Sequence, residues 1–105
     1  SNSTALGFNA LYANTTGIIN VAIGHSALKC NTTGIGNTAV GTSALSSNLA
    51  SNSTALGFNA LNRNTTGTGN TAVGPFTLYA NTTGTCNTGV GYFTLVCNTG
   101  TVIQD

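Results

Sequence analysis

Charge is almost absent from this chain, whose 105 residues include two basic residues and one acidic residue. Lys29 and Arg63 are the two cations, and Asp105 is the carboxylate. This leaves no basic patch that could neutralise the phosphates of a nucleic acid, and no polybasic anchor for an anionic membrane. We therefore expect neither nucleic acid nor a membrane surface as a partner.

Groups that could perform catalysis are equally scarce, since His25 is the single imidazole and Asp105 has no second carboxylate beside it in the sequence. General acid–base chemistry and activated nucleophiles need several such groups held together. The glycines recur at a fixed period and form no phosphate-binding motif. The sequence predicts that this segment is not an enzyme and binds no cofactor.

Cysteine occurs three times, as Cys30, Cys86 and Cys97, so at least one thiol has no partner within the chain. Their spacing lacks the paired ligands of a zinc site, and we predict no metal. Cys86 and Cys97 are candidates for a disulfide. We recognise no signal-peptide pattern and no apolar run long enough to span a bilayer in these residues, and we expect any export signal or anchor to lie outside them. Because Ser1 already lies within a repeat, we expect a segment of a longer protein.

A short repeated unit is what the chain does contain. Each unit has a core such as Asn37-Thr38-Ala39-Val40-Gly41, and six cores end in a glycine, at Gly7, Gly24, Gly41, Gly57, Gly74 and Gly91. A fixed period of about 17 residues indicates a stacked repeat. The sequence of residues 1–11 occurs again, unchanged, at residues 51–61. We therefore interpret residues 1–105 as a single solenoid segment that contains two modules, 1–50 and 51–100.

We number each unit from the Asn or Ser that opens it, such as Asn37. Positions 1–5 predict a short strand, and positions 6–11 predict either a second strand or one helical turn. The unit is too short for a full helix. We expect an all-β fold, a parallel β-solenoid of six coils with two short strands per coil, in which neighbouring strands lie about 4.8 Å apart.

Two columns of side chains are expected inside this solenoid. The aliphatic residue at position 4 and the leucine at position 9 are interpreted as inward anchors, each contributing about 1.5–3 kcal/mol when buried. The predicted core comprises Val40, Val73, Leu11, Leu28, Leu45, Leu61, Leu78 and Leu95. Asparagine at position 12 suits a turn and can form an amide ladder between coils. The predicted ladder comprises Asn14, Asn31, Asn48, Asn64, Asn81 and Asn98.

Sequons for N-glycosylation accompany these turns, because Asn-x-Ser/Thr occurs at Asn2, Asn14, Asn31, Asn52, Asn64 and Asn81. Turn chemistry alone explains the Asn-Thr-Thr segments. A glycan-coated fibre is the alternative, with Asn14, Asn31, Asn64 and Asn81 as candidate acceptors.

Aromatic and threonine columns leave further functions open. Aromatic residues gather at positions 6, 7 and 10, where they either cover the coil or form a lateral contact. Threonines recur at position 2 and at positions 13–14. Regular threonine ladders on a flat solenoid face are a feature of ice-binding proteins, so ice binding is one alternative function.

The unit Asn-Thr-Ala-Val-Gly-x-x-Ala-Leu-x-x-Asn-Thr-Thr-Gly resembles repeats of bacterial surface fibres and phage tail-fibre-like proteins, over residues 3–100. It is also similar to the head repeats of trimeric autotransporter adhesins. The resemblance implies a parallel β-roll, usually of three chains around one axis, at the cell surface or outside the cell. We expect a segment of an extracellular filament that self-assembles end to end and laterally. An adhesin or tail-fibre shaft that presents a site for surface glycans or a host receptor elsewhere is the alternative.

Overall fold

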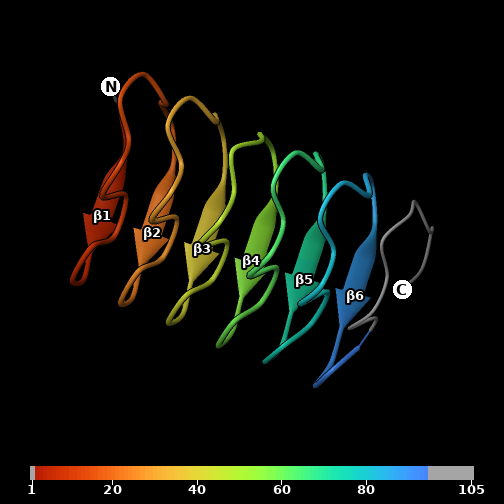
Figure 1. Cartoon of the computed structure of the whole chain (residues 1–105). Coiled ribbons are helices and arrows are strands. Elements are labelled where there is room, and N and C mark those ends of the chain that lie inside the picture. The colour runs from red at the N-terminus through yellow and green to blue at the C-terminus, as the bar shows by residue number, and fades with distance from the viewer. Residues whose placement is uncertain (1, 95–105) are drawn as a thin grey trace.

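A computed structural model describes residues 2–94 and shows a solenoid with one strand in each coil (Figure 1). All neighbouring strands pair in parallel, in the order β1-β2-β3-β4-β5-β6, and each position pairs with the same position of the next unit. The expected all-β parallel solenoid with a spacing of about 17 residues is thereby confirmed. The strands are β1 (Thr4–Leu6), β2 (Val21–Ile23), β3 (Thr38–Val40), β4 (Thr54–Leu56), β5 (Thr71–Val73) and β6 (Thr88–Val90).

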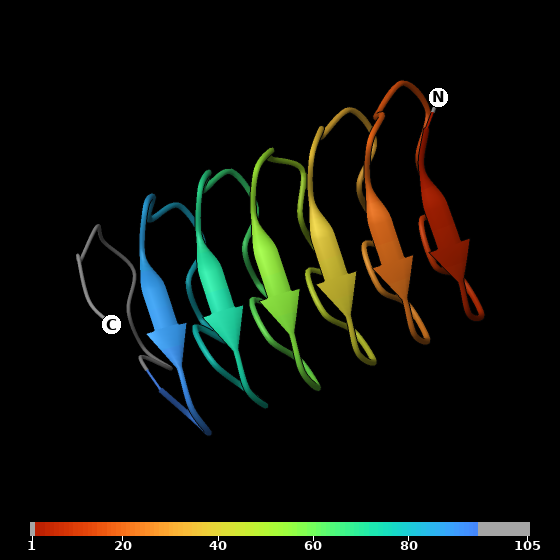
Figure 2. The ribbon, with the colours of Figure 1, turned by 180° about the vertical axis from the view of Figure 1, so that it is seen from behind.

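Each strand ends at the glycine of position 5 because the backbone there adopts a conformation that other residues avoid. Gly41 has φ 132°, and a Cβ on it would lie 2.7 Å from the carbonyl oxygen of Gly57 in the next coil. Only glycine combines this positive φ with so close a backbone contact. The chain then turns back below the strands, as both views of the ribbon show (Figures 1 and 2).

The predicted second strand is wrong, because positions 5–12 form consecutive tight turns. In coil 3, Ala44 N donates to Gly41 O at 3.2 Å, and Asn48 N donates to Leu45 O at 3.1 Å. Between these two turns, Ser46 N donates to Ser43 O at 3.3 Å. Ser43 and Leu45 are the third residues of the first two turns and have φ values of 60° and 51°, and a positive φ at this place is the mark of type II. A strand cannot form where alternate residues are left-handed.

These turns still join the coils through their backbones. Ser43 N donates to His25 O in the preceding coil at 2.8 Å, and Leu45 N donates to Ala60 O in the following coil at 3.0 Å. N–H groups therefore alternate between bonds within the turn and bonds between coils. The turns satisfy the backbone much as a second strand would have done.

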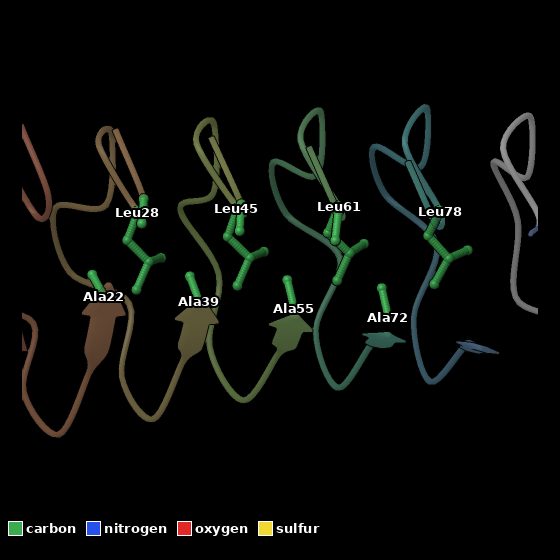
Figure 3. Packing of buried hydrophobic residues seen from close by; sticks show 11 residues of the cluster. Ala22, Leu28, Ala39, Leu45, Ala55, Leu61, Ala72 and Leu78 are labelled. Atoms are coloured by element: carbon green, nitrogen blue, oxygen red, sulfur yellow. The ribbon is translucent and has the colours of Figure 1, made fainter. Parts of the chain in front are cut away.

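The apolar core consists of a column of alanine from the strands that faces columns of leucine and alanine from the turns (Figure 3). The alanines of position 3 in β2 to β5 are 0% exposed, as are the leucines of position 9 in the same coils. The residues are Ala22, Ala39, Ala55 and Ala72, and Leu28, Leu45, Leu61 and Leu78. The leucine column is confirmed at these four rungs, Leu11 is half-buried, and Leu95 lies outside the described residues.

The assignment of Val40 and Val73 to the core is wrong, since both are only half-buried. Successive side chains of a strand point to opposite faces, so when the alanine of position 3 points inward, positions 2 and 4 must point outward. A small residue fits inside because each coil is narrow and the leucine on the opposite side fills the remaining space.

Candidate functional site

Buried asparagines fill the part of the interior next to the Thr-Thr-Gly turns. The Asn64 side-chain amide donates to Asn48 Oδ1 at 2.7 Å and to the carbonyl oxygen of Gly67 at 2.9 Å. Asn81 Nδ2 donates to Asn64 Oδ1 at 2.9 Å, and Asn31 Nδ2 donates to Asn14 Oδ1 at 3.1 Å. The predicted column of position 12, with its amides bonded to backbone and to each other, is confirmed for Asn31, Asn48 and Asn64; Asn98 lies outside the described residues.

A second ladder at position 1 was not predicted. Asn37 N donates to Asn20 Oδ1 at 2.9 Å, and Asn37 Oδ1 in turn accepts from Ser53 N at 3.0 Å. The Asn37 amide also donates to the carbonyl oxygen of Ala50 at 2.7 Å. The constant Asn or Ser at position 1 is the signal of this ladder in the sequence, where it also marks the start of each unit.

Both ladders together satisfy the polar interior. Within residues 2–94, every buried side-chain nitrogen or oxygen has a hydrogen-bond partner. The packing around the amides leaves no room at the turn glycine: a Cβ on Gly34 would lie 2.2 Å from both Asn31 Oδ1 and Ala50 O. Buried amides that are fully bonded hold each coil in one register against the next.

The outer face of the sheet carries no charge and is partly apolar. Position 2 contributes a column of threonine with one valine, and position 4 contributes a column of aliphatic residues. Leu6 is 66% exposed and Val90 is 57% exposed, whereas the position-4 side chains of the inner strands are less exposed. Lys29 and Arg63, the cations of the chain, lie in the turns at positions 10 and 11. This flat face is a candidate contact surface.

The first coil leaves its part of the core uncovered. Ala5 is exposed, although its counterparts in β2 to β5 are 0% exposed, and Leu11 is only half-buried. Thr4 N and Leu11 N donate to coil 2, at Asn20 O and Ala27 O. The other side of coil 1 faces no further coil among the described residues. It therefore presents the inner columns and a row of backbone groups.

Aromatic side chains gather on the turns of coils 4 to 6. Phe76 stacks on Phe93 with centroids 4.8 Å apart and an interplanar angle of 3°, and Phe58 meets Phe76 edge-on at 83°. Tyr79 lies beside Phe76, and the Arg63 guanidinium lies 5.4 Å from the centre of the Tyr79 ring. These rings contact one another from coil to coil, which accounts for part of the column without a ligand.

Threonine hydroxyls in the turns are used within the solenoid. Thr15 Oγ1 donates to the carbonyl oxygen of Thr32 at 3.1 Å, and Thr65 Oγ1 donates to that of Thr82 at 3.2 Å. These hydroxyls link one turn to the next, so they are structural groups as well as surface groups.

Reactive groups are dispersed over the described residues. His25 contacts Ser26 Oγ and the Phe8 ring, and no cluster of three metal-binding side chains exists within residues 2–94. No pocket forms in that part of the structure, and none of its segments is a helix that could cross a bilayer. Cys30 and Cys86 are exposed, while Cys97, the predicted disulfide partner of Cys86, lies outside the described residues.

Burial reverses the predicted choice of glycan acceptors. The candidate acceptors Asn31, Asn64 and Asn81 are 0% exposed and their amide nitrogens donate within the ladder, so the folded chain leaves these amides inaccessible to a glycan. Asn14 is half-buried, and its Nδ2 donates to Gly17 O at 3.1 Å. The remaining sequon asparagines, Asn2 and Asn52, are exposed.

Comparison with known proteins adds no relative: no family model matches the chain, and neither a curated protein nor a solved structure is similar to it.

Proposed function

We propose that this chain is a structural segment of an extracellular fibre, in which solenoids stack end to end. The observation that carries the proposal is the repeated register: each strand position pairs with the same position of the next coil, so any coil can dock on another, and the first described coil presents Ala5 in the place that inner coils bury. Natural solenoids that remain monomeric close their ends with polar caps. Placement outside the cell rests on the resemblance to bacterial surface fibres.

A coil of the same repeat is the partner that best fits this end. Inner coils show what such a partner supplies: Asn20 Oδ1 accepts the Asn37 N–H, and Asn14 Oδ1 accepts from the Asn31 amide. A further coil placed before coil 1 would cover Ala5 and Leu11 and would extend both ladders by one rung. Because a head-to-tail contact of this kind does not close on itself, it produces a filament.

Lateral contact through the outer sheet face is the second part of the proposal. The face is about 10 Å wide and about 29 Å long for six strands, roughly 300 Å² in all. A stable interface buries about 800 Å² on each partner. A single chain's sheet face is therefore too small to hold two chains together. Lateral pairing should appear only when stacked chains join their faces into one long strip.

Two lysine substitutions in β1 test the two contacts separately. Ala5→Lys places a charge on the uncovered inner column, and we expect it to abolish filaments because it blocks docking of a coil. Leu6→Lys adds the same charge one residue later, on the outer face, and should leave end-to-end filaments that no longer bundle. Electron microscopy and sedimentation velocity of the three proteins measure length, width and mass.

Filaments of unchanged length from Ala5→Lys would contradict end-to-end stacking at this end. A wild-type chain that stays monomeric on concentration, with coil 1 still open, would overturn the proposed function as a whole.

A further inference from the structure

The residue directly before position 1 of each coil lies in a column beside the sheet. Backbone bonds align this column: Asn52 N donates to Ile35 O at 2.9 Å, and Cys86 N donates to Thr68 O at 3.0 Å. All its members after Asn2 have a positive φ. The column comprises Asn2, Ile19, Gly36, Asn52, Gly69 and Cys86.

Asn52 stands between two residues without side chains. Gly36 precedes it in the column and Gly69 follows it, so neither neighbouring rung places a side chain against Asn52, whose own Oδ1 lies 2.9 Å from where a Cβ on Gly36 would be. The Asn52 side chain is exposed, and its side-chain amide makes no hydrogen bond within residues 2–94. It begins the sequon Asn52-Ser53-Thr54.

We propose that the folded solenoid carries an N-linked glycan at Asn52 and, in the preceding module, at Asn2. The donor would be an oligosaccharide linked to a lipid diphosphate. The Asn52 side-chain nitrogen bonds to C1 of the first sugar, and the bond from C1 to the diphosphate oxygen breaks. The diphosphate leaves with the electron pair, and an amide proton passes to a base of the transferase.

The same fold excludes the sequons inside the ladder. Asn64 Nδ2 already donates to two acceptors, and its side chain is completely buried, so an attached sugar would have to replace a rung of the ladder. The glycan would therefore decorate one edge of the fibre once per 50-residue module, outside the inner ladders.

The experiment secretes the chain from a eukaryotic host that has an oligosaccharyltransferase. Soluble folded protein is treated with peptide N-glycosidase in heavy-oxygen water, and mass spectrometry then reports occupancy at each sequon. We expect occupancy at Asn2 and Asn52 and none at Asn31, Asn64 or Asn81. Thr54→Ala should abolish occupancy at Asn52 alone.

Two substitutions in the column sharpen the test. Asn52→Gly removes the acceptor and installs the residue that both neighbouring rungs already have, so the glycan-free chain should keep its melting temperature. Gly69→Asn completes a new sequon with Asn70 and Thr71, and a Cβ at Gly69 lies 3.6 Å from Cys86 Sγ, an ordinary contact. We expect this new sequon to become occupied in folded protein.

An empty Asn52 in folded secreted chain would overturn the proposal and would indicate that Asn52 is present only because asparagine tolerates a positive φ. Occupied Asn64 in a chain that melts at the wild-type temperature would overturn it as well. Either result leaves fibre formation untouched, because stacking is measured separately by microscopy.

Discussion

Leucine occupies position 9 in every coil because of the backbone conformation at that position. Leu28, Leu45 and Leu61 have φ values of 51°, and they are the largest apolar side chains that are completely buried. A β-branched residue is disfavoured at positive φ, although Ile19 adopts 59° elsewhere in this chain. Valine and isoleucine, which have similar hydrophobicity, are therefore less suited to this position than leucine. Alanine on the opposite side leaves the space that leucine fills.

Leu45→Ala tests this core at the scale of one residue. We expect the free energy of unfolding to fall by about 2–5 kcal/mol, because the alanine column opposite cannot expand into the cavity. Val40→Ala in the same coil is the control, and its effect should be clearly smaller since Val40 is half-buried and faces outward. Urea denaturation followed by circular dichroism measures both, and equal losses would contradict the assignment of the core.

At the scale of the element, the turn after each strand explains the single proline of the chain. Pro75 occupies position 6, the second residue of the turn in which Thr77 N donates to Gly74 O at 3.3 Å. This is the position at which type I and type II turns favour proline. Across residues 2–94, no position-6 N–H donates a backbone hydrogen bond, so proline costs nothing there.

Transfer of this proline to coil 3 tests the interpretation. Thr42→Pro should be tolerated and should stabilise the chain by about 0.4–1 kcal/mol, because it restricts the unfolded state. Ser43→Pro, one residue later, should destabilise the chain by more than that. Ser43 has φ 60°, and its N–H donates to His25 O at 2.8 Å. Proline cannot adopt this φ and has no N–H to donate. Thermal melting of the two variants should shift in opposite directions.

At the scale of the whole molecule, the solenoid is nearly one-dimensional. Every strand contacts only its neighbours, and the molecule extends 32 Å along its longest axis against 20 Å and 16 Å in the other directions. Stability in such a fold is approximately a sum of repeat and interface contributions. Coils should therefore be removable in whole units.

Deletion of residues 54–70 checks this expectation. Thr54 and Thr71 are register partners, so the deletion joins Ser53 to Thr71 and removes one complete coil. We expect a folded solenoid with an unchanged circular dichroism spectrum per residue and a slightly lower melting temperature. Deletion of 54–61 alone, about half a coil, breaks the register and should leave the chain unfolded. A stable half-coil deletion would contradict the repeat as the unit of folding.

The period alone predicted the fold, because identical residues that recur at a constant spacing can stack only in parallel and in register. The period also predicted the leucine and asparagine columns, since both residue types are constant at positions 9 and 12. It could not predict which of Ala39 and Val40 faces inward, because this depends on how wide the coil is once its turns have formed. Hydrophobicity favoured valine, but the narrow interior has room for alanine.

Tertiary structure also decided which surface groups are accessible. The six sequons are equivalent by motif, yet Asn64 is buried by its neighbouring rungs and Asn52 is exposed between two glycines. The position-1 ladder likewise depends on contact between coils, since Asn37 accepts from a backbone N–H that lies 16 residues away. Sequence determined the repeat and its columns; stacking determined the direction of each side chain, because only the packed coil distinguishes inside from outside.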